Sequence, residues 1–128
     1  MPPPQVWSNA GCVLSLAPMA FGLPALFTPE KALAGYGLPL GKTPQDQALA
    51  RGVFRMYGVR NVVISLTLLT AWYRGHRETQ GVGLMLGALM ALVDGLVFKD
   101  ILGGGEWEHW GFLPFLVGIG AGVLGWLG

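Results

Sequence analysis

Charged side chains are scarce in this sequence. They make up 12% of its 128 residues, whereas hydrophobic residues make up 52%. Residues 8–27, 82–93 and 111–128 contain no charged side chain at all. In an ordinary soluble domain, about a quarter of the residues are charged. The composition therefore predicts a multi-pass integral membrane protein whose uncharged segments face lipid.

Other absences exclude several classes of function. The net charge is only +1 and no dense basic stripe is present, so a nucleic-acid partner is not expected. The single cysteine, Cys12, cannot form a disulfide within the chain. The two histidines, His76 and His109, lie in different predicted loops, and no group of residues has the spacing of a metal site or a phosphate-binding loop. We therefore expect neither a metal nor another cofactor.

Four apolar stretches predict four helices in a single domain, residues 1–128. These helices should cover residues 7–27, 45–73, 82–98 and 112–126. The predicted fold class is an all-α transmembrane four-helix bundle with a long loop between helices 1 and 2. If the chain is eukaryotic, its expected location is the endoplasmic reticulum membrane.

The long loop, residues 28–45, is the least regular part of the sequence. It exceeds a tight turn, and its Gly and Pro residues oppose a full-length helix. We expect an ordered loop or a short interfacial helix that covers a cavity. In the helix before it, Pro18 and Pro24 should introduce bends.

The second predicted helix carries polar residues where a membrane span should be apolar. The run after them, residues 62–73, provides only about 18 Å of helix, so Arg60 and Asn61 should lie inside a hydrocarbon layer about 30 Å thick. Tyr57 shares their face of the helix. A second stripe, on nearly the opposite face, contains Arg51, Arg55 and Gly58. One stripe should point into the bundle, and the other should contact the loop or lipid headgroups.

The third predicted helix supplies a partner for Arg60. Asp94 follows the apolar run GLMLGALMALV. Because the connection between helices 2 and 3 is short, these helices should be antiparallel neighbours, with Asp94 and Arg60 at similar depth. A carboxylate and a guanidinium buried at one level should form an ion pair, since either charge alone would be costly. His109 and Trp110, in the segment GGGEWEHW, approach from the same side.

Two interpretations of this polar group remain open. Polar side chains can simply fix which helices pack together in a membrane. Alternatively, a carboxylate beside an arginine, with tyrosine, asparagine and histidine as donors, suits general acid/base catalysis on an apolar substrate. Epoxide opening, ring closure and double-bond isomerisation all fit these groups.

The segments FRMYGVRN, ALVDG and EWEHW resemble those of a family of small four-helix integral-membrane proteins from fungi and bacteria, long described as a domain of unknown function. Some members accompany fungal polyketide gene clusters and look like epoxide hydrolases or cyclases acting on polyene epoxides. The resemblance extends over nearly the whole chain. It implies that an epoxide is opened by water or by an internal hydroxyl. The matching polar positions are Tyr57, Arg60, Asn61 and Asp94.

We therefore predict a cofactor-independent membrane enzyme that opens or cyclises an epoxide of a lipophilic, polyketide-like substrate. Asp94 would act as base or acid with Arg60 as its charge partner, Tyr57 and Asn61 would position the reacting groups, and His109 would assist protonation. Expected substrate-binding residues are Arg51, Arg55 and Trp110. The alternatives are a small transporter or proton-coupled carrier, usually a homodimer, and a non-catalytic membrane assembly subunit. Membrane lipids are expected partners in every case.

Overall fold

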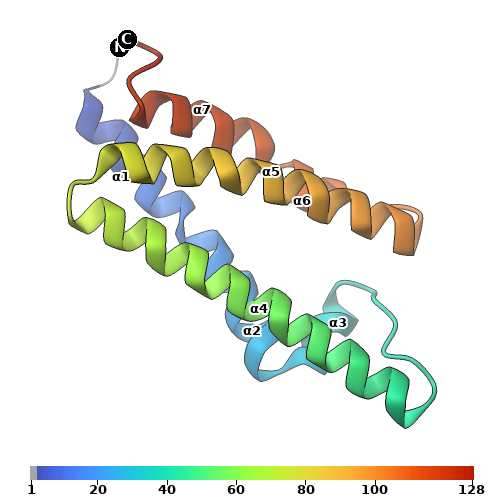
Figure 1. Ribbon diagram of the computed structural model, residues 1–128. Helices are drawn as coiled ribbons and strands as arrows, with labels where there is room; N and C mark the ends of the chain where they lie inside the picture. The colour runs from blue at the N-terminus through green and yellow to red at the C-terminus, as the bar shows by residue number, and fades with distance from the viewer. Residues whose placement is uncertain (1–2) are drawn as a thin grey trace. The chain divides into compact units, whose positions relative to one another are not determined.

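The computed structural model describes residues 3–128, and every regular element in that part of the chain is an α-helix (Figure 1). The predicted all-α class is therefore confirmed. The chain divides into two units, the first comprising Met1–Ser15 with Leu66–Gly128 and the second Leu16–Ser65. The first unit contains α1 (Pro4–Leu14), the end of α4 (Pro44–Tyr73), α5 (Arg77–Leu102), α6 (Trp107–Trp110) and α7 (Leu113–Val123). The second unit contains α2 (Leu16–Phe27), α3 (Pro29–Gly35) and most of α4.

The stretch predicted as one helix over residues 7–27 contains two helices, α1 and α2, with a turn at Ser15. Pro18 has no backbone N–H, so the carbonyl group of Leu14 lacks the donor that would continue the helix. The Ser15 hydroxyl donates to the carbonyl oxygen of Gly11 at 2.6 Å. The described residues thus form more helical segments than the four predicted.

The second predicted helix, residues 45–73, agrees with α4 to within one residue. Its start is specified locally. The backbone N–H of Asp46 donates to Oγ1 of Thr43 at 3.1 Å, and the N–H of Thr43 donates to Oδ2 of Asp46 at 3.4 Å. This reciprocal arrangement is a capping box, and Pro44 occupies the first helical position, where no N–H is required.

The third and fourth predicted helices differ from the structure at their ends. Residues 82–98 are the middle of the longer α5, because helical hydrogen bonding continues into the polar residues on both sides of the apolar run. α5 ends at Gly103, which has φ 71° and donates its N–H to the carbonyl oxygen of Lys99 at 2.8 Å. Residues 112–126 form only the shorter α7, which the single-turn α6 precedes.

The segment predicted as a loop or short helix, residues 28–45, contains α3. This helix ends in a Schellman motif: Gly37 has φ 71°, and the N–H of Leu38 donates to the carbonyl oxygen of Leu33 at 2.9 Å. The side chains of Leu33 and Leu38 belong to the same apolar cluster, which is the hydrophobic contact that usually accompanies this motif.

Small residues let α5 and α7 lie side by side in the first unit (Figure 1). A Cβ added to Gly120 would be 3.3 Å from the carbonyl oxygen of Gly81. The indole of Trp7, on α1, lies directly over Gly122 on α7. Close backbone approach of this kind compensates for the weak hydrophobic drive between helices in lipid.

A second close approach holds the second unit together, between α2 and α4. A Cβ added to Gly58 would lie 2.6 Å from the backbone nitrogen of Leu26 and 2.7 Å from the carbonyl oxygen of Gly22. Beside this crossing, Ala25, Leu33 and Phe54 form a buried apolar cluster. This cluster joins α2, α3 and α4.

Two stretches are long and apolar enough to cross a membrane: Pro4–Phe27, which combines α1 and α2, and Arg77–Leu102, which is α5. Most of their residues are not buried within the structure. On α5, the large apolar side chains of Val82, Leu86, Leu89 and Val93 are between 45% and 58% exposed. A core helix of a soluble protein would bury this face, so the exposure is consistent with contact with lipid.

Candidate functional site

In the first unit, two of the predicted catalytic residues lie on neighbouring helices, Asp94 on α5 and His109 on α6. Asp94, half-buried, lies one turn before Phe98 on the same face of α5. The imidazole of His109, on α6, packs against the Phe98 ring with 4.4 Å between ring centroids. His109 is only 8% exposed. In the first unit, the imidazole of His109 therefore packs against α5 one turn after the carboxylate of Asp94.

Trp110, predicted to bind substrate, fastens α6 to α5. Its indole lies so close to Gly95 that a Cβ there would overlap it, and its Nε1 donates to the carbonyl oxygen of Leu92 at 3.1 Å. Lys99 lies 5.9 Å from the centre of the same ring and 3.8 Å from a carboxylate oxygen of Glu106. The observed contacts of Trp110 are thus packing contacts, and its contact with substrate stays a prediction.

In the second unit, α4 arranges Tyr57 and Arg60 in one row with Phe54. The rings of Phe54 and Tyr57 are stacked, with centroids 5.0 Å apart and an interplanar angle of 12°. The Arg60 guanidinium lies 5.2 Å from the centre of the Tyr57 ring, within the range of a cation–π interaction. The exposed guanidinium of Arg60 is therefore held against an aromatic face, and the predicted roles of Tyr57 and Arg60 stay predictions.

Asn61 is buried on the face of α4 that meets α2. It is 9% exposed, and its buried amide nitrogen, Nδ2, has no hydrogen-bond partner. A Cβ added to Gly22 would lie 3.0 Å from the Cβ of Asn61 and 2.7 Å from the carbonyl oxygen of Gly58. This corrects the assignment of faces from the sequence, because Asn61 and Gly58 both face α2.

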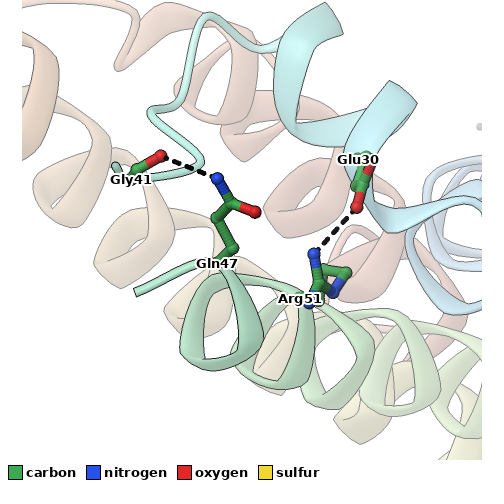
Figure 2. Close-up of polar contacts among 4 residues, drawn as sticks. All are labelled: Glu30, Gly41, Gln47 and Arg51. Atoms are coloured by element: carbon green, nitrogen blue, oxygen red, sulfur yellow. Dashed lines mark hydrogen bonds and ion pairs between the residues drawn. The ribbon is translucent and has the colours of Figure 1, made fainter. Parts of the chain in front are cut away.

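One residue of the second predicted stripe, Arg51, contacts the segment before α4. A guanidinium nitrogen of Arg51 lies 2.9 Å from a carboxylate oxygen of Glu30, on α3 (Figure 2). One turn before Arg51, the side-chain amide of Gln47 donates to the carbonyl oxygen of Gly41 at 3.4 Å (Figure 2). Arg55 is exposed. Arg51 thus binds a carboxylate of the chain itself.

The structure groups the predicted site residues by unit. Tyr57, Arg60 and Asn61 lie on α4 in the second unit, whereas Asp94 and His109 lie on α5 and α6 in the first. The ion pair between Arg60 and Asp94 joins residues of different units and stays a prediction from the sequence.

Sequence reasoning missed a buried polar contact in the first unit. Gln80 on α5 is fully buried, and its amide donates to the carbonyl oxygen of Ser8 at 2.8 Å. In return, the Ser8 hydroxyl donates to Oε1 of Gln80 at 2.7 Å. The sequence predicts a loop at Gln80, because this residue precedes the apolar run. Its one usable signal is its spacing of four residues before Leu84, a fully buried residue on the same face.

These observations define an all-α protein with two membrane-crossing candidates and buried polar groups in both units. In residues 3–128, no group of three or more His, Cys, Asp or Glu side chains is arranged to hold a metal ion. A family model described as "Domain of unknown function (DUF4267)" matches residues 15–123, and the chain belongs to this family. No curated protein and no solved structure matches the chain.

Proposed function

We propose that this protein is a multi-pass membrane enzyme, built as a transmembrane four-helix bundle, that opens or cyclises an epoxide of a lipophilic substrate by general acid/base catalysis. The observation that carries the proposal is the buried, unpartnered amide nitrogen of Asn61. The roles of Asp94 as base and His109 as acid are predictions from the sequence, because these residues belong to the first unit and Asn61 belongs to the second.

The exposed surface of α4 supports multiple membrane crossings. Its side chains at Leu49, Val53, Met56 and Val63 are between 55% and 69% exposed. Their spacing of three, four and seven residues places them on one face of the helix. This stripe, which also contains the exposed Arg60, adds apolar surface to that of the two candidate spans.

The buried side-chain amide of Asn61 supports binding of a ligand next to this residue. A buried donor without a partner costs about 1–3 kcal/mol, so nearly all such groups in proteins are hydrogen-bonded. The cost is recovered if a ligand supplies an acceptor. An epoxide oxygen is an acceptor without a hydrogen to donate, and negative charge develops on it as the ring opens, which strengthens the bond from Asn61.

The proposed reaction balances without a cofactor. Asp94 takes a proton from water, the water oxygen forms a bond to an epoxide carbon, and the bond from that carbon to the epoxide oxygen breaks. The epoxide oxygen then takes a proton from His109, and the proton on Asp94 returns to His109 through water, which restores both groups. In the cyclisation, a hydroxyl of the substrate replaces water, and the product is an isomer of the substrate.

The test measures turnover of a panel of lipophilic polyene epoxides by detergent-purified protein, with products resolved by mass. We expect Asn61→Leu to lower turnover by about 10²- to 10³-fold, the usual effect of removing one donor to a developing oxyanion. The same substitution should raise the melting temperature or leave it unchanged, because it replaces an unsatisfied buried amide with an apolar group of similar size.

Asp94→Asn is the second variant, and it should abolish turnover while the protein stays folded. A melting temperature that falls in Asn61→Leu, with turnover retained, would show that Asn61 only joins helices. No conversion of any epoxide by folded wild-type protein would refute the proposed reaction. Uptake of a solute into proteoliposomes would then favour the carrier.

A further inference from the structure

The two units carry charges of opposite sign. The second unit, Leu16–Ser65, contains five basic and two acidic side chains, whereas the first contains three basic and five acidic ones. The basic residues of the second unit are Lys31, Lys42, Arg51, Arg55 and Arg60. The small net charge of the whole chain, +1, therefore conceals a positive second unit, to which an anionic partner would be attracted.

One side of α4 holds the segment that precedes this helix. Gln47, Arg51 and Arg55 follow one another at a spacing of four residues, so they lie on one face of α4. The carbonyl oxygen of Gly41 accepts a hydrogen bond from Gln47 at 3.4 Å, and the carboxylate of Glu30 accepts one from Arg51 at 2.9 Å (Figure 2). Two points of the preceding segment are thus fixed beside this face.

Each of these two points has a lysine next to it. Lys42 follows Gly41 in the chain, and Lys31 follows Glu30. Both lysines therefore lie beside the face of α4 that carries the two arginines. We call the four residues the basic row: Lys31, Lys42, Arg51 and Arg55.

The carboxylates of the second unit are already used within the unit. Glu30 forms the ion pair with Arg51, and Asp46 accepts a hydrogen bond from the backbone N–H of Thr43 at 3.4 Å. The side chains with an exposed positive charge in the basic row are Lys31, Lys42 and Arg55. These charges can therefore be reached by an anion from outside the chain.

The length of α4 places the basic row at the level of lipid headgroups. Its 30 residues extend over about 45 Å, whereas the hydrocarbon layer is about 30 Å thick, or about 20 residues. Tyr73, 81% exposed at the end of the uncharged run 62–73, is the kind of aromatic side chain that marks a membrane surface. About 20 residues before it, near Val53, α4 would leave the hydrocarbon layer. Arg55 lies within a side-chain length of this level.

Basic side chains at this depth suit lipids that carry a net negative charge. A guanidinium binds phosphate oxygens through two parallel N–H donors, and a lysine ammonium adds an attractive point charge. A zwitterionic headgroup carries its own positive charge, which weakens the attraction. Clusters of four or more Lys and Arg residues beside a membrane span are typical of sites for anionic lipids.

We propose that the basic row binds the headgroups of anionic phospholipids and faces the leaflet that contains them, which in cells is mainly the cytoplasmic leaflet. The inference rests on the proposed crossing of the membrane by α4. It does not rest on the proposed reaction.

The test measures the melting temperature of the full chain in nonionic detergent with added lipid. Dioleoylphosphatidylglycerol should raise it by about 4 °C or more, because a lipid that binds the folded state stabilises that state. Dioleoylphosphatidylcholine at the same concentration should have a much smaller effect. Raising the salt from about 0.1 M to about 1 M shortens the Debye length from about 10 Å to about 3 Å, so it should remove most of the difference between the lipids.

Charge-neutral variants locate the site. The combined variant Lys31→Gln, Lys42→Gln and Arg55→Gln should lose at least about half of the shift caused by the anionic lipid. Arg74→Gln is the matched control, because Arg74 is an exposed arginine of the first unit, and it should keep the full shift. If the combined variant does not fold, Arg55→Gln alone replaces it and should lose about a third of the shift.

Three results would overturn the proposal. Equal shifts with the two lipids would show that headgroup charge is not recognised. An undiminished shift in the variants would show that the basic row is not the site. An equal shift with soluble glycerol phosphate would show that the occupant is a free anion and not a lipid.

The crossing of α4 is tested separately, with a charged maleimide added outside sealed vesicles. In a Cys12→Ala background, only one of Lys42→Cys and His76→Cys should be labelled. Labelling of both would contradict the crossing, and with it the depth assigned to the basic row. The melting temperatures are measured without an epoxide, so a failure of the proposed reaction would leave them unchanged.

Discussion

Gly58 offers a direct test of how α2 and α4 pack. A methyl group at this position would lie 2.6 Å from the nitrogen of Leu26 and 2.7 Å from the carbonyl oxygen of Gly22, whereas ordinary contact begins at 3.4 Å. The two backbones would therefore have to separate by about 0.7–0.8 Å. Both neighbours are main-chain atoms of a helix, so no side chain can rotate away to make room.

The magnitude follows from two opposing effects of Gly58→Ala. Inserting a methyl group into a tightly packed contact costs about 1–3 kcal/mol. Replacing a helical glycine by alanine gains about 0.8–1 kcal/mol. Gly52, on the same helix, has nothing within 4 Å of an added Cβ, so Gly52→Ala should show the gain alone. The two variants should therefore differ by about 1–3 kcal/mol, or roughly 4–12 °C in melting temperature for a chain of this length.

The assay is thermal unfolding in detergent, followed by far-ultraviolet circular dichroism. We expect Gly52→Ala to melt above the wild type and Gly58→Ala to melt at or below it. Equal stabilisation by both substitutions would refute the close crossing of α2 and α4. It would also favour the assignment from the sequence, which places Gly58 and Asn61 on nearly opposite faces of the helix.

Three further predictions concern packing and topology. Ser8→Ala should lower the free energy of unfolding by about 1–3 kcal/mol, because Gln80 loses its buried donor, and adding Gln80→Leu should recover part of that loss; a double-mutant cycle measures the coupling. Gly37→Ala should cost about 1–2 kcal/mol in the same unfolding assay, because its φ of 71° is strained for alanine. If α5 crosses the membrane, a charged maleimide added outside sealed vesicles should label only one of His76→Cys and Gly104→Cys; labelling of both would contradict a crossing.

The helices could be predicted from the sequence because its apolar runs are long and residues typical of turns separate one run from the next. The prediction of α4 was accurate at both ends, where Thr43 and Pro44 begin the helix and Tyr73 ends it. The ends of α5 were missed because hydropathy measures the length that fits a bilayer, whereas helical hydrogen bonds continue into polar residues. The break at Ser15 depends on the missing N–H of Pro18, a residue for which the sequence predicts only a bend.

The candidate site could be predicted in part. Arg60 and Asp94 stand out in the sequence because charge inside a lipid-facing segment is costly. Spacing along one helix could not show that Asn61 is buried against α2, nor that Arg51 binds Glu30, since each of these contacts involves a second helix. The contact between Trp110 and α5 could not be predicted either, because it depends on the absence of a side chain at Gly95.

The sequence by itself determined the helical class of the chain, its apolar spans and the few residues whose charge or polarity is unusual there, because hydropathy and charge belong to the residues themselves. Only the tertiary structure decided that Gly58 is a contact point, that Asn61 keeps a buried donor without a partner, and that Glu30 closes onto Arg51. These properties depend on how closely helices approach and how each is rotated. Neither quantity can be read from one helix alone.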